Sequence, residues 1–192
     1  MPSLTPPVIP AGRLAGSGQP VLSAGDGLVL RPWFPDDAAA LLAAYADPDI
    51  ERWHAYRMDS ADEAASVIQR WTRGWRAEAA ASWAVVDGTD GPLTGRMALR
   101  MMDLREGVAE CAYWTVAGFR GRGVAVLGLA ALTSWAFAAG FHRLFLRHSV
   151  GNPASCRVAE KCDYALEGTE ISSALHADGW HDMHVHARTR PT

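Results

Sequence analysis

A glycine- and arginine-rich hexapeptide, Arg120-Gly121-Arg122-Gly123-Val124-Ala125, stands between a predicted strand and a long apolar helix. Gly121 and Gly123 lack a Cβ, so the backbone can approach a ligand closely there. The free N–H groups of the first helical turn and the helix dipole would then face an anion, and the two arginines add positive charge. The segment therefore predicts a phosphate-binding loop, although the same letters also occur in ordinary basic turns.

The spacing of this loop separates it from the two common nucleotide motifs, GxxxxGK[ST] and GxGxxG. It fits [RQ]-x-x-G-x-[GA], with Arg120, Gly123 and Ala125 at the fixed positions. In this respect the chain resembles the GNAT superfamily of acyl-CoA N-acyltransferases, in which this pattern binds the pyrophosphate of the acyl carrier. The hexapeptide alone is weakly specific, so the remaining elements have to support it.

Length and composition indicate one globular domain. The chain has 192 residues, of which 49% are hydrophobic and 20% charged. Its net charge of −3 gives no electrostatic case for binding nucleic acid. No run of about 18 apolar residues predicts a membrane span, and no basic cluster before an apolar core predicts a signal peptide. Three cysteines are few and odd in number, which favours reduced thiols and a cytoplasmic location.

Residues 1–27 are rich in proline and glycine, and we expect an extended N-terminal arm there. Residues 28–190 are expected to form a single domain. It opens with a strand at 28–31, a helix capped by Asp36 or Asp37 that runs to about Tyr45, and a helix opened by the capping box Ser60–Glu63. Strands are predicted at 82–87, 93–102 and 108–116, which form an antiparallel meander.

The second half predicts a buried helix over 123–139, because its apolar residues lie on every side. A strand at 142–150 follows, and the strand–helix–strand unit implies a parallel pair. Asn152 caps a short helix that has Pro153 at its first position and runs to about Lys161. The last strands are predicted at 164–171 and 181–188.

This order of elements, β-α-α-β-β-β-α-β-α-β-β, matches the GNAT order. Three segments strengthen the resemblance: Glu110-Cys111-Ala112-Tyr113-Trp114 before the loop, Asn152–Lys161, which reads N-x-x-S-x-x-x-x-x-K, and Glu167-Gly168 followed by a last strand with Trp180-His181-Asp182. Together they look like the Rim-type branch of ribosomal-protein N-terminal acetyltransferases. The resemblance implies an α/β (α+β) fold, with a mixed, mostly antiparallel sheet of about seven strands, about four helices, and a parallel pair at the cofactor site.

The same resemblance implies that acetyl-CoA is the co-substrate. The amides of 121–125, with Arg120 and Arg122, would hold the pyrophosphate, and Val124 and Ala125 would begin the helix beneath it. Pantetheine would lie along the strand residues Trp114, Thr115 and Val116, and would also touch Asn152.

Two residues are candidates for acid–base chemistry. Glu110 could deprotonate the amine, directly or through water, or could be a solvated or ion-paired strand carboxylate. Many GNAT enzymes carry a tyrosine acid seven residues after the asparagine, where this chain has Ala159. Ser155 is the alternative, because its hydroxyl could donate a hydrogen bond to the leaving thiolate. It could equally be an ordinary first-turn serine.

The acceptor site is expected beside the segment 50–56, with Trp53, His54 and Tyr113 as substrate-binding candidates. The acceptor stays open between a protein N-terminal amine and a small amine. A non-catalytic CoA-binding or regulatory module is the alternative from another class, and a homodimer is a further expectation.

One pattern invites a metal interpretation, His181-x-x-His184-x-His186. On a strand, His184 and His186 would share a face with Asp182. No cluster of cysteines or glutamates accompanies these histidines, so the sequence favours ordinary edge-strand histidines and no metal site.

Overall fold

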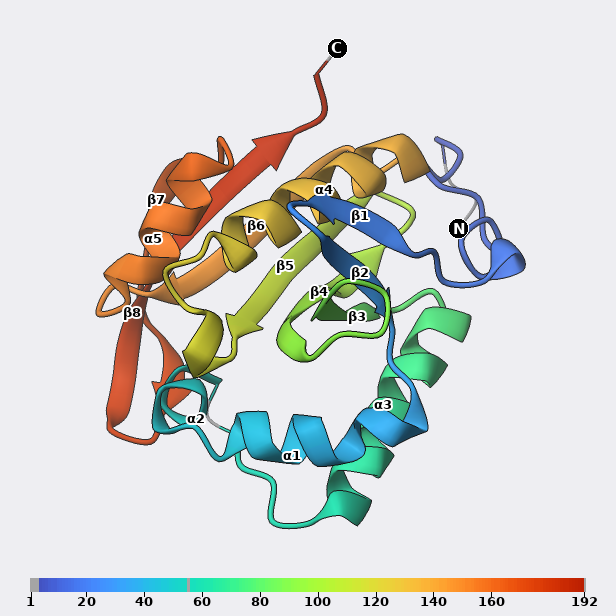
Figure 1. Cartoon of the computed structure of the whole chain (residues 1–192). Helices are drawn as coiled ribbons and strands as arrows, with labels where there is room; N and C mark the ends of the chain where they lie inside the picture. The colour runs from blue at the N-terminus through green and yellow to red at the C-terminus, as the bar shows by residue number, and fades with distance from the viewer. Residues whose placement is uncertain (1–3, 55, 192) are drawn as a thin grey trace.

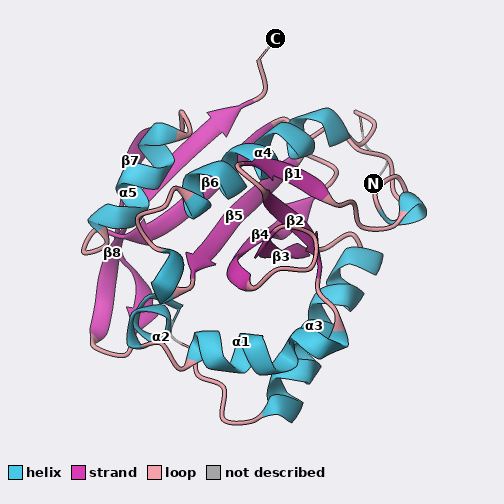
Figure 2. Ribbon diagram, in the orientation of Figure 1, coloured by secondary structure: helices cyan, strands magenta, loops and turns pink. Residues whose placement is uncertain are grey.

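A computed structural model describes residues 4–54 and 56–191 (Figure 1). The strands form one sheet in the order β1-β2-β3-β4-β5-β6-β8-β7, with helices packed around it (Figure 2). The strands are β1 (Leu22–Gly25), β2 (Leu28–Pro32), β3 (Ala81–Asp87), β4 (Leu93–Asp103), β5 (Val108–Thr115), β6 (Arg143–Ser149), β7 (Ala165–His176) and β8 (Gly179–Thr189). The α-helices are α1 (Ala38–Tyr45), α2 (Pro48–His54), α3 (Ala61–Arg76), α4 (Val124–Ala139) and α5 (Pro153–Lys161). Short 3₁₀ turns lie at Ala15–Ser17 (η1), Pro35–Asp37 (η2) and Ala117–Phe119 (η3).

The predicted mixed, mostly antiparallel sheet is confirmed, since β5 and β6 are its parallel pair. The described residues hold eight strands and five α-helices, one more of each than expected. The additional helix is α2, in the segment predicted as a linker. Asp47-Pro48 does end α1, but Pro48 also suits the first position of a new helix, and Asp47 Oδ1 accepts the Asp49 N–H at 2.9 Å. Ala55, in the same segment, lies outside the described residues.

The additional strand, β1, belongs to the predicted arm. It is a short edge strand in which Leu22 pairs with Leu30 of β2. The preceding chain packs against the domain as well, because Ile9 and Leu14 are buried in the larger hydrophobic core. Glu78 holds this segment in place, since its carboxylate accepts the N–H groups of Gly12 and Leu14 at 2.6 and 2.7 Å. The described part of the arm is therefore packed along the domain despite its irregular composition.

The helices cover both faces of the sheet. Arg96 and Met97 are neighbours on β4 and point to opposite faces. The Arg96 guanidinium lies 4.4 Å from the ring centroid of Trp71 on α3. On the other face, Met97 packs so close to α4 that a Cβ at Gly128 would come within 2.6 Å of its terminal methyl group. Figure 1 shows α4 running across β5 and β6, apart from the α1 and α3 pair.

The parallel pair is short, and this creates the opening in the sheet. Residues Val108, Ala109 and Glu110 pair with Arg143, Leu144 and Phe145, and the β5–β6 ladder then stops. Beyond it β5 remains paired with β4 as far as Thr115, while β6 remains paired with β8 as far as Ser149. The two central strands therefore diverge toward the end at which α4 and α5 begin.

Candidate active site

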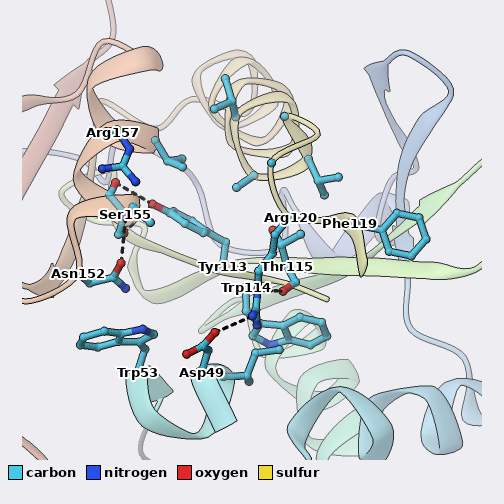
Figure 3. A pocket seen from close by; sticks show the side chains of 18 of the residues that line it. Asp49, Trp53, Tyr113, Trp114, Thr115, Phe119, Arg120, Asn152, Ser155 and Arg157 are labelled. Carbon is cyan, nitrogen blue, oxygen red and sulfur yellow. Dashed lines mark hydrogen bonds and ion pairs between the residues drawn. The ribbon is translucent and has the colours of Figure 1, made fainter. Parts of the chain in front are cut away.

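A cavity of about 550 Å³ lies where β5 and β6 separate (Figure 3). Its walls come from α2, the second half of β5, the loop before α4, the first turn of α4, and α5. The sequence-predicted site residues among its lining are Trp53, His54, Tyr113, Trp114, Thr115, Arg120, Gly121, Gly123, Val124, Ala125, Asn152 and Ser155. The fold thus brings α2 to the loop before α4, about 70 residues further along the chain. It also brings β5 to α5, about 40 residues further along.

The predicted phosphate-binding loop forms one end of the cavity. Gly121 and Gly123 have φ angles of +76° and +81°, in the left-handed region that glycine adopts without strain. A Cβ at Gly121 would meet no atom within 4 Å, so the backbone angle is what requires glycine there. The Leu127 N–H is the first to bond within the helix, to the Gly123 carbonyl at 2.9 Å. The first-turn N–H groups before it are left for an anion.

The arginines of this loop are placed differently from expectation. Arg120 lines the cavity, but its guanidinium forms ion pairs with Asp47 and Asp49 of 2.9 and 2.7 Å. Burial acts to raise the pKa of Asp47, but hydrogen bonds from Arg120 and two backbone N–H groups outweigh it and lower that pKa. Arg122 lies outside the lining, 5.4 Å from the ring centroid of Phe119.

Two other cations do line the cavity. Arg157 and Lys161 lie four residues apart on α5, so they share one face of that helix. Sequence reasoning did not assign either residue to the site. Lys161 could have been found, because it is the lysine of the N-x-x-S-x-x-x-x-x-K segment.

Tyr113 and Ser155 meet across the cavity. Their hydroxyl oxygens lie 2.8 Å apart, and Tyr113 Oη is also 3.3 Å from the Ser155 carbonyl oxygen. Burial raises the pKa of Tyr113, although the hydrogen bond from Ser155 opposes this, so the phenol stays protonated at neutral pH. Asn152 places the serine, because its Oδ1 caps α5 by accepting the Ser155 N–H at 3.1 Å.

The open side of β5 offers backbone groups to a ligand. The Val116 N–H bonds to the Thr94 carbonyl at 2.9 Å, toward β4. Alternate residues of an antiparallel strand direct their backbone N–H and C=O groups to the same neighbouring strand. The backbone groups of Tyr113 and Thr115 therefore point away from β4, toward the edge of β5 where pairing with β6 has ended. Val116 was predicted to contact the cofactor, but it lies outside the cavity lining and its N–H is already used.

A family model described as "Acetyltransferase (GNAT) domain" matches residues 27–165. The chain belongs to the GNAT acetyltransferase family. The resemblance inferred from its motifs is thereby confirmed.

The relatives of this GNAT domain agree with that assignment. The protein named "Putative ribosomal N-acetyltransferase YdaF" from Bacillus subtilis (strain 168) is 30% identical over 93 residues, which are 48% of this chain. The match spans about half (50%) of that relative's length. Among solved structures, RimL, the ribosomal L7/L12 alpha-N-protein acetyltransferase in complex with coenzyme A, superposes with a TM-score of 0.82 at 20% identity, covering 88% of this chain and 98% of RimL. Mycobacterium smegmatis RimJ in complex with CoA-disulfide gives 0.80 at 23% identity, covering 88% and 86%. At these identities the two structures show the shared fold.

In this GNAT domain Glu110 lies on the face of β5 opposite to Tyr113. Its side chain is 1% exposed, and Oε1 accepts hydrogen bonds from Arg100 at 2.8 Å and Arg147 at 3.4 Å. It is outside the cavity lining. Of the two interpretations that the sequence left open, these contacts match the ion-paired strand carboxylate, because strand alternation turns Glu110 toward the two arginines. Its role as a base stays a prediction.

His54, the last residue of α2, lies beside Tyr113 in the cavity lining. Burial lowers its pKa to about 4, and repulsion from Arg96 and Arg100 adds to this, while a hydrogen bond with the Tyr113 backbone opposes it. The imidazole is therefore neutral at pH 7. Trp53 lies on the same helix. Its ring centroid is 6.4 Å from the ring centroids of His176 and His181, which flank the turn of the β7–β8 hairpin.

Within the described residues, no helix is long and apolar enough to cross a membrane.

Proposed function

We propose that this protein transfers an acetyl group from acetyl-CoA directly to a primary amine. The observation that carries the proposal is the divergence of β5 and β6 after Glu110 and Phe145, beside the glycine loop. This arrangement supplies an open strand edge for an extended ligand and, at its end, amides for a diphosphate. Family membership agrees with this activity.

The diphosphate would be held by the loop amides at Gly121–Ala125 and by the α4 N-terminus. Arg157 and Lys161 would add positive charge from α5. The pantetheine arm would lie along the free edge of β5, next to Tyr113 and Thr115, as the backbone directions of that strand allow. Asn152 would meet it from the opposite wall.

In the transfer step the amine nitrogen bonds to the thioester carbonyl carbon, and the carbon–sulfur bond breaks. A free backbone N–H at Tyr113 or Thr115 would stabilise the negative charge on the carbonyl oxygen. The leaving thiolate would take its proton from Ser155, which Tyr113 reprotonates through their 2.8 Å contact, and the phenolate left on Tyr113 would regain a proton from solvent. The proton of the amine passes to water or to a side-chain base. Tyr113 would thus supply from β5 the phenol that the family usually places at Ala159.

Two groups are proposed on the amine side. His54 is a neutral hydrogen-bonding partner, and Trp53 forms an aromatic wall. We take a protein N-terminal amine as the first candidate acceptor, because the names of the YdaF, RimL and RimJ relatives point to ribosomal proteins or to the Rim branch. A small amine is the second. The homodimer and the cytoplasmic location stay predictions.

The test is acetyl-CoA turnover, followed as released CoA thiol, with a panel of N-terminal peptides and small amines. Turnover with any amine, abolished by omitting that amine, is the expected result. Turnover confined to peptides, or to small amines, identifies the acceptor class. CoA binding with no transfer to any acceptor would contradict the enzymatic proposal and favour a CoA-binding module.

A further inference from the structure

Three histidines and a cysteine converge between α5 and the sheet, on the face that α5 covers. His148 comes from β6, His184 and His186 from β8, and Cys156 from α5. Their ligand atoms all lie within 4.8 Å of one another. The sheet register explains the meeting: His148 stands directly opposite His184, and His186 is two residues further along the same face. Cys156 is brought over them by the first turns of α5.

Two of the histidines have fixed tautomers. His148 Nδ1 lies 2.9 Å from the Ser149 carbonyl, and His186 Nδ1 lies 3.2 Å from the Tyr164 carbonyl. A carbonyl oxygen only accepts, so each Nδ1 carries the proton and each Nε2 keeps a lone pair. His186 Nε2 points at Cys156 Sγ, 3.7 Å away. Backbone carbonyls that orient imidazoles in this way are the usual outer partners of metal-binding histidines.

Two ring nitrogens in the group have no hydrogen-bond partner. His148 Nε2 and His184 Nδ1 are both buried and unsatisfied among residues 4–54 and 56–191. His148 itself is only 6% exposed. Leaving a buried polar atom unpaired is costly, and both residues belong to the group whose ligand atoms lie within 4.8 Å of one another. A cation satisfies both at once.

Asp182 is not part of the group, contrary to the pairing considered from the sequence. Its Oδ1 accepts the Ser172 N–H at 2.8 Å. Glu160 Oε1 lies 3.6 Å from Cys156 Sγ, but its side chain is exposed on α5. The remaining donors are three imidazole nitrogens and one sulfur. Imidazole nitrogens and thiolate sulfur are donors that Zn²⁺ binds in tetrahedral geometry, with the donor atoms about 3.3–3.6 Å apart, so closing the site needs a contraction of roughly 1 Å.

We propose that His148, Cys156, His184 and His186 bind one Zn²⁺ ion as a closed, four-coordinate structural site. The Cys156 thiol gives up its proton to solvent on binding, and no oxidation or reduction takes place. The ion fastens the first turns of α5 to β6 and β8. Because Ser155 precedes Cys156, the site would also fix the wall of the cavity that carries Asn152 and Ser155. The inference does not depend on the acetyl transfer proposed above.

The first measurement uses the full chain, stripped with a chelator and titrated with Zn²⁺ against a chromophoric competitor. We expect one tightly bound ion per chain. At free Zn²⁺ 100 times the dissociation constant, the folding equilibrium rises about 100-fold, which raises the Tm by roughly 5–10 °C. Failure to bind near one equivalent, or an unchanged Tm, would overturn the proposal.

The second measurement identifies the ligands. Co²⁺ in this site should give tetrahedral d–d bands and a thiolate-to-metal charge-transfer band in the wild-type protein. Cys156→Ala should abolish the charge-transfer band, and His184→Gln should weaken Zn²⁺ binding at least 100-fold. His142→Gln, which removes an exposed histidine outside the group, should change neither. A wild-type Co²⁺ spectrum without thiolate charge transfer would contradict the site even if a variant failed to fold.

Discussion

The hydroxyl oxygens of Tyr113 and Ser155 lie 2.8 Å apart and join the free edge of β5 to the first turn of α5. The two residues are 42 positions apart in the chain. Their contact crosses the cavity between the diverging strands, where the thioester sulfur is proposed to lie. This pair of hydroxyls is the proton source that we propose for the leaving thiolate.

Removing either hydroxyl should slow the chemical step. We expect Ser155→Ala and Tyr113→Phe each to lower kcat by roughly 10²-fold with little change in KM for acetyl-CoA, because general acid catalysis contributes on that order. The double variant should be little worse than either single one, since the two groups act as a unit. Steady-state kinetics measure this, with exposed Tyr56→Phe as control. Full activity of Ser155→Ala would leave the serine a structural role only.

The phosphate loop offers a matched pair of glycines. Gly123→Ala should raise KM for acetyl-CoA by roughly 10-fold, because alanine at a φ of +81° costs about 1–2 kcal/mol and shifts the amides. Gly118→Ala lies in the same segment, where an added Cβ would meet no atom within 4 Å and φ is not in the positive region, so it should leave KM unchanged. Equal effects of the two changes on KM would contradict the role of the loop in binding the diphosphate.

The cations that are proposed to contact the diphosphate, Arg157 and Lys161, can be tested by charge removal. Lys161→Gln and Arg157→Gln should each raise KM for acetyl-CoA by roughly 10-fold, a typical value for a lost charged hydrogen bond. The effect should shrink at high salt, since exposed charges are screened. Arg122→Gln is the control, because this side chain lies outside the cavity lining. A larger effect for Arg122 would restore the arrangement expected from the sequence.

Glu110 has a testable structural role. Glu110→Gln should lower stability by about 1–3 kcal/mol, less than for a fully buried ion pair because Arg100 and Arg147 remain partly in water. That corresponds to a fall in Tm of roughly 3–10 °C. Glu170→Gln removes the other, more exposed partner of Arg147 and should cost little. If Glu110 is instead the base, its replacement will cut kcat most at low pH, which the pH–rate profile shows.

The lowered pKa of His54 makes stability depend on pH. Its folded-state pKa of about 4 lies below the ordinary histidine pKa of 6.5, so protonation favours the unfolded chain. The stabilising contribution is therefore complete above about pH 6.5 and is lost as the pH falls through about 4. His148, whose pKa burial also lowers, acts in the same direction.

Thermal melts from pH 7 to 4 test this. The Tm of the wild type should fall, and His54→Asn should show a smaller fall, so that the two curves converge at low pH. His142→Asn, at an exposed position, should follow the wild type. Parallel curves for wild type and His54→Asn would contradict the lowered pKa.

The sequence by itself determined the features that depend on neighbouring residues. The glycine loop, the Asn152 cap, the Ser60 capping box and the order of the strands and helices other than β1 and α2 follow from local spacing, and these pointed to the family. A strand–loop–helix with positive-φ glycines needs no distant partner to take its shape. Most of the lining of the cavity could be assigned for the same reason.

Only the tertiary structure decided which side chains meet. Arg120 turned to Asp47 and Asp49, and Glu110 turned to Arg100 and Arg147, because oppositely charged groups on adjacent elements lie within contact distance once the chain folds. The metal-ligand group shows this most clearly. His184 and His186 looked like ordinary strand histidines until β6 supplied His148 and α5 supplied Cys156. Strand register and helix packing, neither of which spacing along the chain determines, brought those four ligands to one point.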